Sequence, residues 1–167
     1  MKILISACLL GEPVRYDANS NDNKVAHTSQ RLAEWKKQGI VIPVCPELLG
    51  GLSVPRPAAE IAGGDGLQVL NGQSRILANT GEDVTDAFVE GAHKALEVAL
   101  RHQAVAALLA ARSPSCGSDS TYDGTFTSTL TSHQGVTAAL LSQHGIRCFT
   151  PERFNELEQW YSDQDKG

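Results

Sequence analysis

The feature that most constrains the fold of this chain is its alternation of short apolar runs with amphipathic segments. Such alternation is typical of βαβ units, in which helices connect the parallel strands of one sheet. We therefore predict a single domain over residues 1–167, of the α/β class. Its expected architecture is a three-layer, Rossmann-like open sheet, mainly parallel and flanked by helices. The predicted core strands are residues 2–7, 40–44, 104–110 and 146–149.

Helical spacing and turn residues define the segments between these strands. Residues 68–77 are expected to form a hairpin that turns at Asn71-Gly72, a pair favoured in type I′ turns. Residues 48–66 and 112–133 are long loops, and loops of that length usually serve a site. The predicted helices are residues 27–38, a long one from 82 or 83 to 102, residues 134–143, and a last one that starts at Pro151 behind Thr150 as N-cap.

The charge balance limits the partners of the chain. It has 14 Lys and Arg against 19 Asp and Glu, a net charge of −5, and no basic stripe. We therefore expect no polynucleotide partner, although a helix N-terminus or an arginine can bind one phosphate. The apolar N-terminal run is too short for a signal peptide or a membrane span. We expect a cytoplasmic protein without a membrane partner, and the sequence does not give its oligomeric state.

Three of the four cysteines occupy the same kind of position. Cys8 follows the first predicted strand, Cys45 follows the second, and Cys116 lies in the loop after the third. In an open parallel sheet, ligands bind outside the carboxyl ends of the strands. These cysteines are therefore expected to meet at one edge of the sheet. Cys148 lies inside the last strand without turn residues around it, so we interpret it as a core thiol.

The number of cysteines limits which metal they can hold. In a cytoplasmic protein they are more readily thiols or metal ligands than disulfides. Structural zinc prefers four ligands, often in close CxxC pairs, and this chain has no such pair. Three separated cysteines suit catalytic zinc or an iron–sulfur cluster with one free iron. Zinc with three thiolates is electron-rich and a poor Lewis acid, so we favour the cluster.

A series of short motifs stands in a fixed order along nearly the whole chain, and together they resemble the thiouracil desulfidase (TudS) family. The C-terminal end alone has no matching motif. The motifs are Val-Arg-Tyr-Asp at 14–17, Val-Cys-Pro-Glu at 44–47, Gly-Gly-Leu at 50–52, Pro-Arg at 55–56, Asp-Val-Thr at 83–85, Ser-Pro-Ser-Cys-Gly at 113–117, Tyr-Asp-Gly-Thr-Phe at 122–126 and Gly-Val-Thr-Ala-Ala-Leu-Leu at 135–141.

The resemblance implies a [4Fe-4S] cluster held by Cys8, Cys45 and Cys116, with the fourth iron open to the sulfur of the substrate. It also implies an enzyme that removes sulfur from thiolated uracils without net redox change, releasing sulfide and the oxo base. Glu47 and Ser113 correspond to a glutamate and a serine of the family's motifs. Glu47 is expected to act as general base through a water molecule. Ser113 is expected to bind the substrate or to relay a proton.

Each of these two roles has a structural alternative, and the chain departs from the family at two points. Glu47 is also suited to pair with Arg56, and a serine before Pro114 is also an ordinary turn former. Ala110 stands where family members often have lysine. Ala18 follows Tyr16-Asp17 where many have glycine. Neither departure affects a predicted cluster ligand, but both are expected to affect the substrate pocket.

Loops on the same side of the sheet hold further candidates for substrate binding. Arginines bind phosphate bidentately, aromatic rings stack on bases, and hydroxyls with backbone amides form anion-binding nests. The candidates are Arg15, Arg56 and Arg112 for a phosphate, Tyr16 or Phe126 for the base, and Ser115 with Ser118 and the amides around Gly117 for an anion.

The expected substrate is small. Some relatives with an appended domain act on thiolated tRNA, but this chain lacks the positive surface that tRNA requires. We therefore expect a thiolated nucleobase, or a mononucleotide such as 4-thiouridine monophosphate. Two other classes stay open at this point: another metal-dependent hydrolase, and a binding module that senses metal or redox state.

Overall fold

The centre of the fold is a sheet of four parallel strands. The structure is a computed structural model that describes residues 1–10 and 29–166. The strands stand in the order β2-β1-β5-β8, and this confirms the predicted α/β architecture. All four lie within the predicted core runs: β1 (Lys2–Ser6), β2 (Val41–Val44), β5 (Ala104–Leu108) and β8 (Arg147–Phe149).

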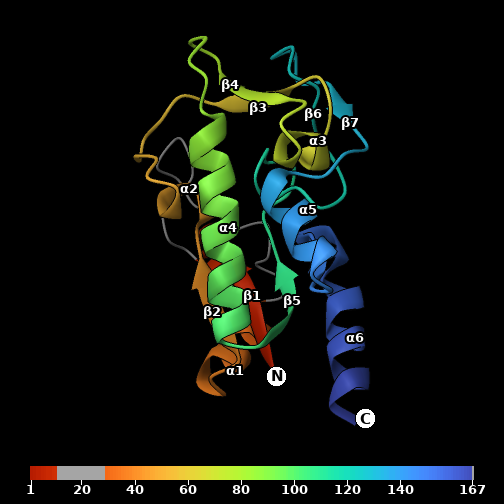
Figure 1. Ribbon diagram of the computed structural model, residues 1–167. Coiled ribbons are helices and arrows are strands. Elements are labelled where there is room, and N and C mark those ends of the chain that lie inside the picture. Colours follow the sequence, from red (N-terminus) through yellow and green to blue (C-terminus); the bar gives the residue numbers. More distant parts are fainter. Residues whose placement is uncertain (11–28, 167) are drawn as a thin grey trace.

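Helices cover the sheet in two layers. Helices α4 (Thr85–Arg101) and α5 (Val136–Gln143) lie side by side in front of the sheet in Figure 1. Helix α1 (Ser29–Lys37) packs instead against the C-terminal helix of the chain. There Trp35 packs against Phe154 and Tyr161 of α6 (Phe154–Lys166), with ring centroids 5.5 Å apart in both pairs. None of the described helices is long and apolar enough to cross a membrane.

Hydrophobic spacing explains the longest helix, α4. Its buried residues Phe88, Ala92, Ala95 and Ala99 recur every three or four positions and face the core. The side chain of Asp83 accepts a hydrogen bond from the Thr85 amide at 2.9 Å, so Asp83 marks the start of the helix, close to where it was predicted.

The strand order creates a topological switch point. β1 lies between β2 and β5, so the chain leaves β1 toward one side and later returns to pair on the other. At such a point the loops at the carboxyl ends of neighbouring strands separate and leave a crevice. The loop that follows β1 contains the short helix η1 (Ala7–Leu10), and the long loop after β5 leads to α5. The crevice therefore lies where the cysteines follow the strands.

The structure corrects the prediction for residues 48–77. The predicted loop 48–66 overlaps helix α2 (Pro46–Leu49) and contains strand β3 (Ala59–Ala62). The predicted hairpin at Asn71-Gly72 is wrong, because residues Gly66–Leu70 form helix α3. A capping box causes this: Asp65 and Gln68 each accept the other's backbone amide at 3.0 Å. Gly72, at φ 78°, follows the end of α3, and β4 (Arg75–Ala78) then pairs antiparallel with β3.

The second long loop contains a small hairpin. Strands β6 (Thr121–Tyr122) and β7 (Leu130–Thr131) pair antiparallel within the segment predicted as loop 112–133. At the end of the chain, Thr150 is the N-cap of η3 (Pro151–Arg153), which leads into α6. The predicted start of the last helix is thus confirmed.

Helix α2 lies directly against α4 at a contact between backbones. A Cβ atom on Gly50 would lie 2.0 Å from the carbonyl oxygen of Ala87, and one on Gly91 would lie 2.0 Å from the carbonyl oxygen of Pro46. Both distances are far below van der Waals contact. Only glycine at positions 50 and 91 allows α2 to come this close, so this contact fixes the position of the segment that begins at Cys45.

We expect Gly91→Ala to destabilise the protein. In an exposed helix this change would stabilise by roughly 1 kcal/mol. Here the new methyl group overlaps the Pro46 carbonyl oxygen, so overpacking is expected to lower the free energy of unfolding by about 1–3 kcal/mol. Urea unfolding measures the effect, with His93→Ala, an exposed position on the same helix, as control. Equal stability of Gly91→Ala and the wild type would contradict the tight contact.

Candidate functional site

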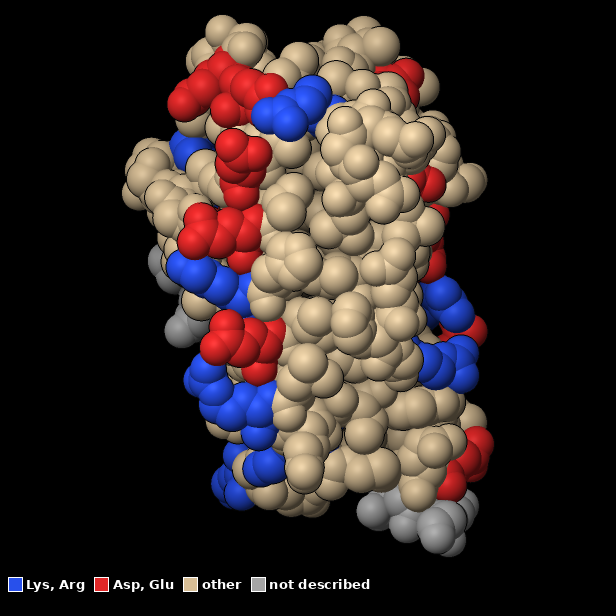
Figure 2. All heavy atoms as spheres, viewed as in Figure 1, with Lys and Arg blue, Asp and Glu red and all other residues tan. Residues whose placement is uncertain are grey.

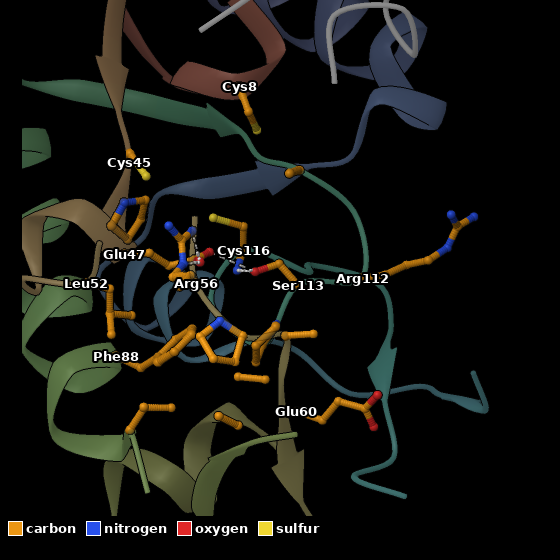
Figure 3. Close-up of a pocket in the computed structure, with 18 of the residues that line it drawn as sticks. Cys8, Cys45, Glu47, Leu52, Arg56, Glu60, Phe88, Arg112, Ser113 and Cys116 are labelled. Carbon is orange, nitrogen blue, oxygen red and sulfur yellow. Dashed lines mark hydrogen bonds and ion pairs between the residues drawn. The ribbon is translucent and has the colours of Figure 1, made fainter. Parts of the chain in front are cut away.

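A cavity of about 540 Å³ lies at the carboxyl ends of β1, β2 and β5. We call it the cysteine cavity because Cys8, Cys45 and Cys116 all line it. Cys8 comes from η1, Cys45 from the link between β2 and α2, and Cys116 from the loop after β5. Figure 3 shows their side chains around a common space. The structure therefore brings together the three cysteines that strand order places at one edge.

Burial raises the pKa of two of these thiols, those of Cys45 and Cys116. Cys8 and Cys116 are buried, and Cys45 is half-buried. Burial raises the pKa of Cys116 well above its ordinary value, and the negative charges of Glu47 and Cys8 raise it further. Burial is also the main cause of the raised pKa of Cys45. The thiolate forms of these residues therefore need a positive group inside the cavity to balance them.

The spacing of the donors limits which group fits. Within residues 1–10 and 29–166, no three His, Cys, Asp or Glu side chains form a set that could hold a metal ion. A [4Fe-4S] cluster is much wider than one ion and takes each thiolate on a different iron, so its ligands can stand further apart. Three thiols around a cavity of this size are compatible with such a cluster.

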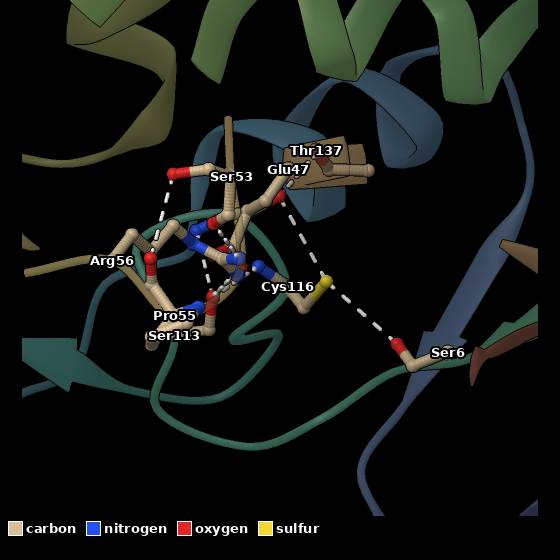
Figure 4. A network of polar contacts seen from close by, with 9 residues as sticks. Ser6, Glu47, Ser53, Pro55, Arg56, Ser113, Cys116 and Thr137 are labelled. Atoms are coloured by element: carbon tan, nitrogen blue, oxygen red, sulfur yellow. Dashed lines mark hydrogen bonds and ion pairs between the residues drawn. The ribbon is translucent and has the colours of Figure 1, made fainter. Parts of the chain in front are cut away.

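Ser6 links the ends of two core strands beneath Cys116. It is the last residue of β1, and its hydroxyl donates a hydrogen bond to the Cys116 sulfur at 3.7 Å. The same oxygen accepts the amide of Ala110, two residues beyond β5, at 3.2 Å. Figure 4 shows Ser6 directed at the sulfur of Cys116. Ser6 was not identified from the sequence, because a serine at the end of a strand carries no distinctive pattern.

Glu47 and Arg56 form a partly buried ion pair in the wall of the cavity. The Nε atom of Arg56 donates to Oε2 of Glu47 at 2.9 Å, and the Nη2 group contacts the same oxygen. Nη1 of Arg56 donates to the Ser53 carbonyl at 2.9 Å. The Glu47 side chain keeps 17% of its surface exposed, against 6% for Arg56. Arg56 therefore holds the carboxylate in one orientation while part of it stays open to the cavity.

Ser113 contacts both Glu47 and its own loop. Its hydroxyl lies 3.5 Å from Oε1 of Glu47, at the long limit of a hydrogen bond. The same oxygen accepts the amides of Ser115 at 3.0 Å and Cys116 at 3.2 Å. Figure 4 shows this network, which connects Cys116 to Glu47 through Ser113. Ser113 thus has the turn-forming role and also lines the cavity.

The predicted anion nest around Gly117 is not open to a ligand. The amides of Ser115 and Cys116 bond to the Ser113 hydroxyl, and the Gly117 amide bonds to the Ser113 carbonyl at 2.9 Å. Ser115 is fully buried, and its hydroxyl bonds to that of Thr137 at 2.7 Å. Ser118 is buried as well. The loop uses the amides of Ser115, Cys116 and Gly117 to hold Cys116 in place against Ser113, which spacing alone does not reveal.

The other predicted substrate-binding residues are placed unequally. The Arg112 side chain points away from the cysteines in Figure 3 and lies 3.5 Å from Glu152. Phe126 lines the cavity with 40% of its surface exposed. Arg15 and Tyr16 lie outside the described residues. Arg56, as described, is paired with Glu47.

Cys148 lies apart from the other three cysteines. It is half-buried in β8, does not line the cavity, and its sulfur lies 3.6 Å from the Ile146 carbonyl oxygen. Burial raises its pKa to about 11, so the thiol is neutral at neutral pH. This agrees with its interpretation as a core thiol.

Comparison with known proteins gives three consistent matches. A family model described as 2-thiouracil desulfurase matches residues 3–153. The uncharacterized protein YbbK of Bacillus subtilis (strain 168) is 43% identical over 155 residues, which cover 93% of this chain and 99% of that protein. A solved structure titled [4Fe-4S]-dependent thiouracil desulfidase TudS matches with a TM-score of 0.85 and 39% identity, over 96% of this chain and 97% of that one. All three cavity cysteines lie within the range of the family match.

Proposed function

Because the chain belongs to the 2-thiouracil desulfurase family, we propose that Cys8, Cys45 and Cys116 hold a [4Fe-4S] cluster with one iron free for substrate. The protein is a desulfidase, an enzyme that removes sulfur from thiolated uracil. The observation that carries the assignment of ligands is the meeting of three thiols, from three strand ends, at one cavity. The similar structure is named as a [4Fe-4S]-dependent enzyme, which supports the same cofactor here.

The electrostatics of the cavity support a cationic occupant. Burial and the negative charge of Glu47 both raise the pKa of Cys116 and of Cys45, which disfavours the thiolates of these two residues in an empty cavity. The iron ions of a cluster would provide the balancing charge, and thiolates are the usual protein ligands of such clusters.

When bound, the cluster supplies a Lewis-acidic iron whose affinity for soft sulfur makes sulfide a better leaving group. The remaining roles fall to side chains of this chain. Glu47 is the general base: its carboxylate takes a proton from the water that attacks the thiocarbonyl carbon. Arg56 fixes the orientation of that carboxylate through two N–H groups. Ser113, which lies between Glu47 and Cys116, donates a hydrogen bond to the substrate or relays the proton.

The cavity and the surface support a small substrate. A volume of about 540 Å³ is within the range of small-molecule sites. On the face shown in Figure 2, basic and acidic side chains alternate along the edge of α4, and no basic band is present. Two i,i+4 ion pairs, Lys94 with Glu90 and Arg101 with Glu97, account for part of that alternation. A polynucleotide requires many phosphate contacts, so a nucleobase or mononucleotide fits better.

The desulfidase activity and its substrate are tested together by turnover on three compounds. Anaerobically purified enzyme is given 4-thiouracil, 4-thiouridine and 4-thiouridine monophosphate, and released sulfide is measured with the oxo product. We expect all activity to require iron-loaded protein. A preference of at least about tenfold in kcat/KM for the monophosphate, equal to about 1.4 kcal/mol, would assign the mononucleotide as substrate.

Equal values of kcat/KM for the three compounds would contradict a mononucleotide preference and would assign the free base as the smallest sufficient substrate. If the iron-loaded enzyme releases sulfide from none of the three compounds, the thiouracil chemistry itself is contradicted.

A further inference from the structure

A buried carboxylate outside the proposed chemistry supports one wall of the cysteine cavity. Glu60 lies in β3, is 9% exposed, and lines the cavity. Its Oε1 atom accepts two backbone amides, from Gly124 at 2.9 Å and from Phe126 at 3.1 Å. Hydrogen bonds to a charged acceptor are stronger than those between neutral groups. Glu60 therefore fastens the loop between β6 and β7 to the edge of the cavity.

This loop has an unfavourable backbone conformation. Phe126 and Ser128 have φ angles of 57° and 59°, in the left-handed region that residues other than glycine rarely adopt. Gly124, at φ 97°, comes so close to β3 that a Cβ atom there would lie 2.5 Å from the Ile61 carbonyl oxygen. Such conformations persist only where the surroundings impose them, and they concentrate at functional sites.

The hydroxyl groups of three threonines reinforce the loop. The oxygen of Thr125 lies 2.6 Å from that of Thr127, which lies 2.8 Å from that of Thr129. The Thr125 hydroxyl and amide also bond to Asp123, at 2.6 Å and 3.0 Å. These bonds and the two amides on Glu60 together hold the loop in its conformation.

The hydrogen bonds that hold this loop fix the position of one aromatic ring, that of Phe126. Phe126 is a large apolar residue, yet 40% of its surface is exposed, and it lines the cavity. Figure 3 places Glu60 on the side of the cavity away from the cysteines, with its carboxylate directed at this loop. A ring left exposed at a cavity, at the cost of backbone strain, is suited to a flat ligand rather than to the core.

We propose that Phe126 is the surface on which the ring of the thiolated pyrimidine stacks and that Glu60 is the positioning residue that keeps Phe126 there. The inference rests on the proposed function, which supplies a flat, conjugated substrate. A pyrimidine held by its sulfur at the cysteine side leaves both faces of its ring free. Every nucleobase has a π face, so stacking on an aromatic side chain contributes substantially to the binding of any base.

The first test separates aromatic stacking from simple apolar contact. Phe126→Leu is expected to raise KM at least about fivefold, the lower end of the range for one stacked base, with kcat changed less than about twofold. Phe126→Tyr keeps the ring and is expected to keep the wild-type KM. Leu130→Ala is the matched control, since Leu130 is similarly exposed in the same hairpin but does not line the cavity.

The second test asks whether Glu60 acts through Phe126. Glu60→Gln removes the charge that both amides contact, and we expect KM to rise with little change in kcat. The double variant Glu60→Gln/Phe126→Leu is then expected to raise KM no further than the larger single change, because both substitutions disturb one contact. If the KM of the double variant rises by the product of the two single effects, or if Glu60→Gln lowers only kcat, Glu60 does not position Phe126.

The outcomes distinguish this inference from the proposed function. Visible absorbance and iron content establish that each variant is folded and loaded. If the wild type releases sulfide and Phe126→Leu keeps its KM, the stacking inference alone is overturned. If the iron-loaded wild type does not act on any thiouracil, the proposed function is overturned, and the inference with it.

Discussion

Replacing Cys8, Cys45 or Cys116 with alanine, one at a time, is expected to bleach the anaerobically purified protein and to abolish its desulfidase activity. All three thiols line one cavity, and the proposed cluster has no spare protein ligand among them. In the proposed cluster one iron already has no protein ligand, so loss of one thiolate would leave a second iron without one. The measurements are the broad visible absorbance of the cluster, iron per chain, and sulfide release.

The fourth cysteine provides the internal control for this experiment. Cys148→Ala removes a half-buried thiol from β8, outside the cavity, and is expected to keep colour, iron and activity. Full iron content after loss of a cavity cysteine would contradict its role as a ligand. A colourless wild type with one zinc per chain would instead support the metal-dependent hydrolase that the sequence left open.

Glu47→Gln is expected to lower kcat by about 10²–10⁴-fold, the usual contribution of a positioned general base, while iron content stays unchanged. Glutamine has the same shape and keeps an oxygen that can accept the hydrogen bonds of Arg56. It cannot take a proton from water at neutral pH, so the loss should appear in kcat with little change in KM.

A carboxylate of the same cavity is the matched control for Glu47. Glu82 is exposed and also lines the cavity, and we assign it no role in the reaction. Glu82→Gln changes the local charge by the same amount and is expected to change kcat by less than about threefold. A wild-type kcat for Glu47→Gln would mean that its pair with Arg56 is only structural, the alternative that the sequence already offered.

Patterns that depend on the order of elements were readable from the sequence. The alternation of apolar runs with amphipathic segments correctly predicted the parallel sheet. Since the carboxyl ends of parallel strands share one edge, that order also placed Cys8, Cys45 and Cys116 together before any distance was known. Cys148 could be separated from them because it lies within a strand instead of after one.

Short sequence patterns that suit two different local structures were less reliable predictors of helices and turns. Asn71-Gly72 suits a hairpin turn and also the end of a helix, and the capping box of Asp65 and Gln68 decided for the helix. The capping box is itself a sequence signal, an aspartate followed three residues later by a glutamine. Glu60 carried a weaker signal, a single acid in an otherwise apolar strand.

Contacts between distant backbones could not be predicted at all. The partners of Gly50 and Gly91 depend on how α2 crosses α4, and no local pattern contains that geometry.

The origin of the three cysteines in separate segments has a consequence for the biogenesis of the holoenzyme. Cys8, Cys45 and Cys116 follow β1, β2 and β5, and only the pairing of β1 with both neighbours brings them together. A nascent chain that has emerged only through β2 offers two of the three donors. If these residues hold the proposed cluster, the complete ligand set exists only after β5 has paired with β1, so we expect the sheet to form before the cluster is inserted.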